Sequence, residues 1–219
     1  MSKPRVDLFG AVHKGLRREI YATATVLEGA NFADDAGKAA AAVALKTTLA
    51  FLDEHILHEG NHIAPKVKAV APDLIPSVKE DHDEHLETSK ELLALLAAVV
   101  GESGPVALGT GVKISQLFNT VVADQVAHMH FEETKINEAL FANYTDEELT
   151  EIRVAIQTAI GPQRFGDWMT LMLPALNFAE LVGMLGTMKA TAPAPVFEGV
   201  SAIAAKVVKD WARVEAAIR

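Results

Sequence analysis

Runs of apolar residues at helical spacing constrain this chain more than any other feature of its sequence. The first run extends from about Val6 to Leu27 and stops at Gly-Ala-Asn, residues 29–31. Alanine and leucine supply much of the apolar content, whereas only 6% of the residues are aromatic, and this composition favours helices over sheets. The pattern therefore predicts an all-α fold.

Three further runs predict three more long helices, at about residues 35–67, 77–100 and 111–143. Pro65 is expected to kink the first of these three, and Ser77 with Glu80 three residues later is typical of a helix cap. Long helices joined by short connections pack as antiparallel neighbours. The first 144 residues are thus expected to form an antiparallel, up-down four-helix bundle.

Shorter helices are expected in the remaining residues, at about 146–159, 162–173, 178–189, 194–207 and 208–218. Thr145, with Glu148 three residues later, predicts a capped start for the first of them. No linker-like composition precedes this segment. We therefore expect residues 1–144 to form one domain and residues 145–219 to form a helical C-terminal extension packed on it.

Composition excludes several classes of function. The chain has no cysteine, which rules out disulfides, thiolate zinc sites and cysteine nucleophiles. Its formal charge of −9 and the lack of a basic run argue against nucleic acid as a partner, because such binding depends on Lys and Arg neutralising phosphates. A transition metal in this chain must therefore rely on nitrogen and oxygen ligands.

Neither an export signal nor a membrane span is expected. The first seven residues, Met-Ser-Lys-Pro-Arg-Val-Asp, carry charges where a signal peptide needs apolar residues, so the cytoplasm is the expected location. The most apolar segment, residues 168–179, is interrupted by Pro174 and Asn177 and is shorter than the roughly 20 residues that a span needs. We expect this segment to be buried core.

The eight histidines all lie in the first 130 residues and divide into one group per long predicted helix. The groups are His13; His55, His58 and His62; His82 and His85; and His128 and His130. Histidines scattered over a surface would seldom divide in this way. The distribution indicates a shared centre inside the bundle.

Two of these helices carry the spacing His-x-x-x-Glu, in His55/Glu59 and His128/Glu132. Residues four apart lie about 40° from one another around a helix, so each pair shares a face and can bind one metal centre. The spacing also repeats, because His13 precedes His55 by 42 residues and His85 precedes His128 by 43. One such pair alone can be an ordinary helix-surface contact, but the repeated arrangement predicts a dinuclear site.

These segments resemble the two signature segments of the hemerythrin-like family, the HHE cation-binding domains, over about residues 5–142. The resemblance implies two iron ions joined by an oxo or hydroxo bridge, with Mn or Zn less favoured. It implies that Glu59 and Glu132 bridge the ions. The implied ligands are His13, His55, Glu59, one or both of His82 and His85, His128 and Glu132.

Several assignments stay open at this point. His82 and His85 lie about 60° apart on an ideal helix, so either or both could bind a metal. Glu132 is favoured over Glu133 because its four-residue step repeats that of the other pair. His130 lies about 200° from His128 and is expected not to be a ligand. His58 and His62 are equally compatible with outer groups near the centre, proton carriers, a secondary metal site or plain polar residues at the end of the bundle.

The first functional hypothesis is that the protein binds O2 or a similar small ligand such as NO, for sensing, carriage or a stress response. Because few of the ligands are carboxylates, binding of a small ligand fits this site better than oxidation of a substrate does. The alternatives are a di-iron enzyme, peroxidase-like or NO-reducing, and a metal-responsive interaction module. A protein partner or a homodimer is compatible with each of them.

Overall fold

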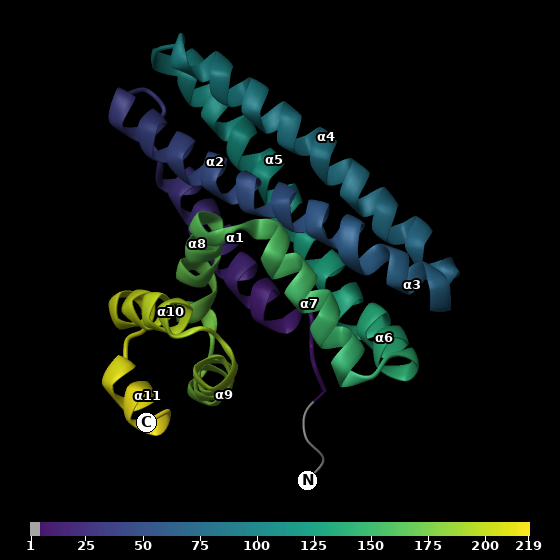
Figure 1. Cartoon of the computed structure of the whole chain (residues 1–219). Helices are drawn as coiled ribbons and strands as arrows, with labels where there is room; N and C mark the ends of the chain where they lie inside the picture. Colours follow the sequence, from purple (N-terminus) through teal and green to yellow (C-terminus); the bar gives the residue numbers. More distant parts are fainter. Residues whose placement is uncertain (1–4) are drawn as a thin grey trace.

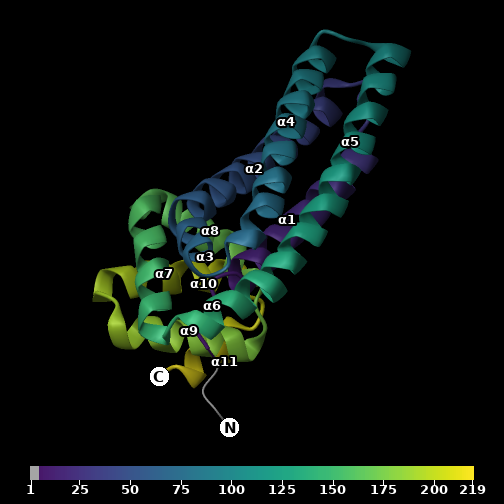
Figure 2. The ribbon, with the colours of Figure 1, turned by 90° about the vertical axis from the view of Figure 1, so that its right-hand side faces the viewer.

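The computed structural model describes residues 5–219, which are almost entirely helical and include no strand. Four long helices run side by side (Figures 1 and 2) and form the bundle: α1 (Gly10–Gly29), α2 (Asp35–His58), α4 (Ile75–Val100) and α5 (Gly104–Phe131). Helix α1 packs against α2 and α5, and α4 packs against α5 and α2. The predicted all-α bundle is confirmed.

Apolar side chains from all four helices fill the centre of the bundle. Leu16, Leu45, Leu92 and Phe118 are each fully buried in one continuous cluster. Gly111 on α5 permits a close approach in this core, because a Cβ atom there would lie 2.2 Å from the ring of Phe32. The helical spacing of the sequence therefore corresponds to a real buried face.

Two of the long helices change to π-helical geometry near the same end of the bundle. Helix α2 continues through η1 (Glu59–Ile63) into α3 (Ala64–Val70), and α5 continues through η3 (Glu132–Ile136) into α6 (Asn137–Asn143). The sequence predicted continuous α-helices with a kink at Pro65. The first π segment does lie just before Pro65, but η3 contains no proline, so proline does not explain both. Each segment begins with a glutamate.

The predicted starts of three of the long helices were wrong. Helix α1 begins at Gly10 and not near Val6, because the Asp7 carboxylate accepts the Gly10 N–H and turns the chain there. Helix α4 begins at Ile75 with a proline in its first turn, so Ser77 lies inside the helix and is not its cap. A short 3₁₀ segment, η2 (Pro72–Leu74), precedes it.

Helix α5 begins seven residues before its predicted start. Gly104 has φ +54°, a left-handed conformation that glycine adopts without strain, and it turns the chain sharply after α4. Pro105 then occupies the first turn, where its missing N–H is not needed. The glycine and proline that were expected only to end the third long helix also start the fourth.

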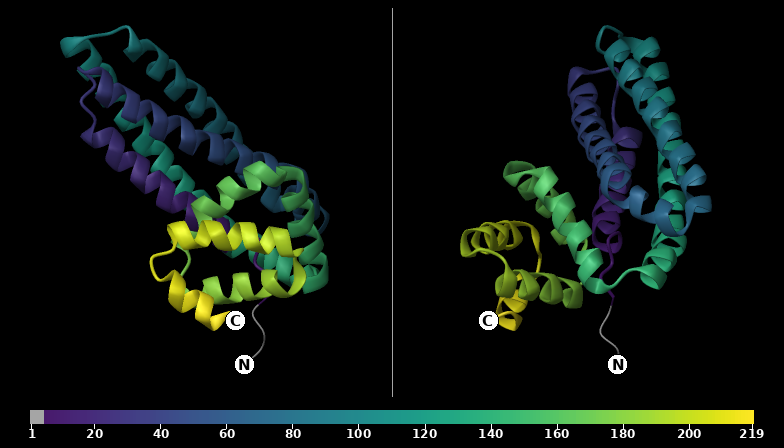
Figure 3. Two further views of the ribbon diagram at one scale, coloured as in Figure 1. Left: turned by 60° about the vertical axis from the view of Figure 1, so that its left-hand side comes forward. Right: turned by 45° about the vertical axis from the view of Figure 1, so that its right-hand side comes forward.

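The C-terminal segment folds into α7 (Asp146–Ile160), α8 (Pro162–Met172), η4 (Leu173–Ala175), α9 (Phe178–Thr191), α10 (Ala194–Val207) and α11 (Trp211–Ala217). The capping box predicted at Thr145 and Glu148 is confirmed, whereas the last helix begins three residues later than predicted. Figure 3 shows these helices gathered at one end of the bundle, away from the turn between α4 and α5.

Helix α8 makes the main contact between this segment and the bundle. Trp168 is buried in the bundle core, with its ring centre 4.8 Å from that of Phe51. Gly15 on α1 allows close approach, because a Cβ atom there would lie 3.2 Å from the Met172 Cα. Lys14 also forms an ion pair with Glu180. The division into domains at residue 144 remains a prediction.

Helices long and apolar enough to cross a lipid bilayer are absent from residues 5–219. The apolar segment at residues 168–179 is buried only in part: Trp168, Met169 and Leu173 are at most 4% exposed, whereas Phe178 near its end is 37% exposed. Residues 1–4, on which the expectation of no export signal partly rests, lie outside the described residues.

Candidate metal centre

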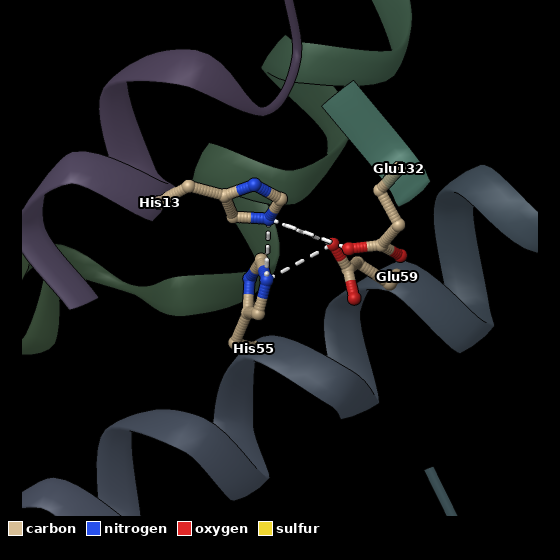
Figure 4. Close-up of side chains that lie close together, drawn as sticks. All are labelled: His13, His55, Glu59 and Glu132. Atoms are coloured by element: carbon tan, nitrogen blue, oxygen red, sulfur yellow. Dashed lines mark hydrogen bonds and ion pairs between the residues drawn. The ribbon is translucent and has the colours of Figure 1, made fainter. Parts of the chain in front are cut away.

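Six side chains from four parts of the chain converge near the π segments. One group joins His13 of α1, His55 of α2 and the two glutamates that begin η1 and η3, Glu59 and Glu132 (Figure 4). The second group joins the same two glutamates to His82 of α4 and His128 of α5. In each group, one possible ligand atom per residue lies within 4.8 Å of the others. We call these six residues the cluster.

The distances within the cluster fit metal coordination. Nε2 of His13 lies 3.1 Å from Nε2 of His55, and Nε2 of His82 lies 3.0 Å from Nε2 of His128. The contacts between these nitrogens and the glutamate oxygens span 3.0 to 3.7 Å. Two ligand atoms that are each about 2.1 Å from one ion lie about 3.0 Å apart at a right angle and about 3.4 Å apart at a tetrahedral angle.

The two glutamates are buried without hydrogen-bond partners. No residue of the cluster is more than 9% exposed. Both carboxylate oxygens of Glu59 and Oε2 of Glu132 are shielded from solvent and accept no hydrogen bond from any described residue. Burial of a carboxylate is costly unless a cation or a hydrogen bond compensates it. These oxygens therefore fit a bound cation, and the donor set of imidazole and carboxylate suits Fe, Mn or Zn.

Without a metal, protons carry the compensating charge. Burial lowers the pKa of His13, but the carboxylates of Glu132, Glu133 and Glu59 outweigh burial and raise that pKa well above its ordinary value. Burial raises the pKa of Glu59, and the surrounding histidines, His55 first, outweigh it and hold the pKa well below its ordinary value. The metal-free cluster thus holds anionic glutamates against protonated imidazoles.

Glu133 orients the first histidine from outside the cluster. Its Oε1 atom lies 3.1 Å from Nδ1 of His13 and accepts a hydrogen bond of 2.7 Å from Nη1 of Arg17. Partial burial raises the pKa of Glu133, but His13 and Arg17 outweigh it and lower that pKa to about 2. An ionised Glu133 accepts the Nδ1 proton of His13, which leaves Nε2 free to face the cluster.

Asp81 does the same for a histidine of the second group. Its Oδ2 atom lies 2.9 Å from Nδ1 of His128. Burial lowers the pKa of His128, but Glu132, Asp81 and Glu59 outweigh burial and raise it to about 9. Neither outer carboxylate was assigned this role from sequence, because each lies on a different helix from the histidine it contacts.

The structure brings six of the seven sequence-predicted ligands together and leaves His85 outside. His82 faces the cluster, whereas Nε2 of His85 lies 3.1 Å from Asp53 Oδ1 and 3.2 Å from Ser89 Oγ. Glu132 belongs to both groups, whereas Glu133 lies outside them and contacts Nδ1 of His13. His130 is exposed on the opposite side of α5, as its position around the helix predicted.

Comparison with protein-family models gives a match over residues 5–140, more than half of the chain, to a domain described as the hemerythrin HHE cation binding domain. The matched range includes all six cluster residues and ends before α7. Comparisons with curated proteins and with solved structures gave no match.

Proposed function

Since the chain belongs to the hemerythrin HHE cation-binding family, we propose that its cluster holds two iron ions and binds O2 or a similar small ligand such as NO. The family and the buried histidine and glutamate groups show that this is a metal-binding helical protein. We propose in addition that the metal is iron, that two ions are bound and that the small ligand is O2 or NO.

One observation carries the proposal of two ions. Glu59 and Glu132 occur in both ligand groups, while each group has its own pair of histidines. Unpartnered carboxylates shared between two imidazole pairs are the arrangement expected of bridging ligands. His13 and His55 would bind one ion, and His82 and His128 the other. Manganese or zinc would fit the same atoms but is less favoured by the family resemblance.

The ligand set favours reversible binding over oxidation. Four neutral imidazoles and two carboxylates carry less negative charge than a carboxylate-rich set, so high oxidation states are less stabilised. Iron here would supply electrons that a diatomic ligand accepts reversibly. Sensing, carriage or a stress response is the proposed context, in the cytoplasm.

The surrounding residues exclude bulk water and hold the imidazoles in place. The Phe9 ring is fully buried and its centre lies 5.3 Å from that of His13. Ile63 and Ile136, which close the two π segments, are at most 4% exposed. Glu133 and Asp81 hold the Nδ1 protons of His13 and His128. A dry, oriented site protects a reactive ligand from proton delivery.

Metal analysis combined with optical titration tests this function. Protein purified without chelators should contain two iron ions per chain, and its visible spectrum should change when anaerobic, reduced protein meets O2 or NO. The O2 change should reverse when oxygen is removed. One zinc ion per chain, or no metal after incubation with ferrous iron, would contradict the proposal. Continuous consumption of O2 with a reductant would instead favour the enzyme alternative.

A further inference from the structure

A second pair of histidines lies beside the cluster but outside both of its ligand groups. His58 ends α2 and His62 lies four residues later inside η1. The spacing His-x-x-x-His on a helix places two imidazoles on one face, where both can bind the same ion. We propose that His58 and His62 form a separate binding site for one divalent transition-metal ion, next to the solvent groove between η1 and α7.

The two rings already face one another. Their centres lie 6.1 Å apart and their planes are inclined by 30°. The ring centres of the two histidine pairs in the cluster are 5.0 and 4.8 Å apart. The planes of the two cluster pairs are inclined by 85° and 63°. Side-chain rotations that bring the outer rings about 1 Å closer and turn them from stacked to edge-to-face would give the arrangement of the pairs that we assign to the metal ions.

His58 has no hydrogen-bond partner for either ring nitrogen. Both Nδ1 and Nε2 are shielded from solvent, and neither makes a hydrogen bond with a described residue. A buried polar group without a partner costs free energy, and a metal ion supplies the missing contact. The His58 imidazole is therefore available to bind a metal ion, because its nitrogens are not engaged in hydrogen bonds with described residues.

A carboxylate lies beside this pair. Glu54 Oε1 is 3.6 Å from Nε2 of His58, while Oε2 of the same residue accepts a hydrogen bond of 2.5 Å from Arg164 on α8. Glu54 can offer one oxygen to a cation and is held in place by the other. Since Arg164 belongs to the C-terminal segment, that segment fixes the third group of the site.

The pair is reached from solvent through a groove. His62 lines a cavity of about 300 Å³ together with Glu148 and Glu151 of α7. The two carboxylates outnumber the one lysine of the groove, Lys66, so the groove attracts cations. Two imidazoles and the Glu54 carboxylate form an incomplete ligand set, so water would complete the coordination. We expect weaker binding here than in the cluster, which offers four protein ligands to each ion.

Zinc stoichiometry of the full chain tests the proposal. Metal-free wild type, His58→Gln and His62→Gln are dialysed against Zn²⁺ buffered in the micromolar range, and bound zinc is counted by elemental analysis. Each variant should bind one ion fewer than wild type. His130→Gln, which removes an exposed histidine from α5, should bind as many ions as wild type.

The same variants are then loaded with iron. The visible spectrum of His62→Gln should equal that of wild type, because the proposed site is separate from the cluster. The proposal is overturned if either variant binds as much zinc as wild type, if His130→Gln loses the same ion, or if the iron spectrum is lost in His62→Gln. The difference of one zinc ion is expected even if the cluster does not bind iron, so this test is independent of the proposed function.

Discussion

The two glutamates of the cluster differ from every other carboxylate described in this chain by the number of histidines around them. Three histidines lie within 4.0 Å of Glu59, and two lie within that distance of Glu132. Neither glutamate contacts a lysine or an arginine among the described ion pairs. A cation held between them would satisfy oxygens that the fold leaves without hydrogen bonds.

Replacing both glutamates should remove metal binding without unfolding the bundle. Glu59→Gln with Glu132→Gln keeps the size of each side chain but removes both charges, so the double variant should bind iron poorly and remain helical. Thermal melts with and without iron measure the effect. Wild type should show a large metal-dependent rise in Tm, which the double variant lacks and which Glu138→Gln, an exposed position on α6, retains. An equal rise in wild type and the double variant would show that these glutamates are not ligands.

Metal binding should release protons near neutral pH. In the metal-free protein the pKa of His128 is raised to about 9 and that of His13 is also raised, so both rings are protonated at pH 7. A metal ion binds only the neutral ring, so at least these two protons must leave. A pH indicator in weakly buffered protein should record about two protons per chain on saturation, and fewer in His128→Ala. Release of no protons would contradict the proposed ligands.

The raised pKa of His128 also makes the stability of the metal-free fold depend on pH. Because the pKa of His128 is higher in the folded than in the unfolded chain, its protonation stabilises the fold. This contribution is complete below the unfolded value of about 6.5 and is lost as the pH rises through about 9. The free energy of unfolding of metal-free wild type, measured by urea denaturation, should therefore fall across this pH range more than that of His128→Ala. An equal fall in the two proteins would argue against the raised pKa of His128.

At the scale of elements, the π segments place the glutamates. A π segment contains one residue more than the α-helix that it replaces, and such segments often occur at functional sites. Here both segments begin at a cluster glutamate and end at a buried isoleucine, Ile63 or Ile136. The extra residue lets the carboxylate turn towards the centre while the isoleucine keeps its place in the core.

Removing the extra residue from η3 should separate metal binding from folding. Deletion of Thr134, which is exposed, should convert η3 to α-helix and rotate Glu132 away from the cluster. We expect unchanged helix content by far-UV circular dichroism and a loss of bound iron by elemental analysis, because Glu132 belongs to both ligand groups. Thr134→Ala keeps the residue count and should keep both ions. Full iron occupancy in the deletion variant would show that the π geometry is not required.

At the scale of the whole molecule, the C-terminal helices depend on α8 for their attachment to the bundle. Trp168 lies 3% exposed within the bundle core, and the guanidinium of Arg164 lies 4.0 Å from the centre of the Phe51 ring. The remaining helices have their own apolar cluster, which includes Leu173, Leu185 and Val200. Helix α8 therefore contributes to both groups of buried side chains, with Trp168 in the bundle core and Met169 in the C-terminal cluster.

Trp168→Ala should lower the free energy of unfolding by about 3–5 kcal/mol, as expected for loss of a large buried side chain. Urea denaturation of the metal-free protein measures this change. Trp211→Ala removes a tryptophan that is only partly buried in the C-terminal cluster and should cost clearly less. Equal effects of the two substitutions would show that Trp168 is not a principal contact between the segments.

The sequence by itself determined the features that depend on neighbours along the chain. The 3.6-residue period predicted the long helices, and the four-residue steps placed His55 with Glu59 and His128 with Glu132 on common faces. The capping box at Thr145 and Glu148 also follows from local hydrogen bonding. These features could be predicted because their geometry is set within one or two helical turns.

Only the tertiary structure decided the features that depend on packing between helices. His82 and His85 lie on nearly the same face of α4, and the contact with α5 turns His82 towards His128 while His85 contacts Asp53 of α2. Packing between helices also decides the contacts of the outer carboxylates, Glu133 and Asp81, because each lies far along the chain from the histidine that it contacts. It decides the π segments as well, because there the helix geometry adjusts to the neighbouring helices. A helical repeat determines which residues share a face, but the direction that face points is set by the free energy of packing the whole bundle.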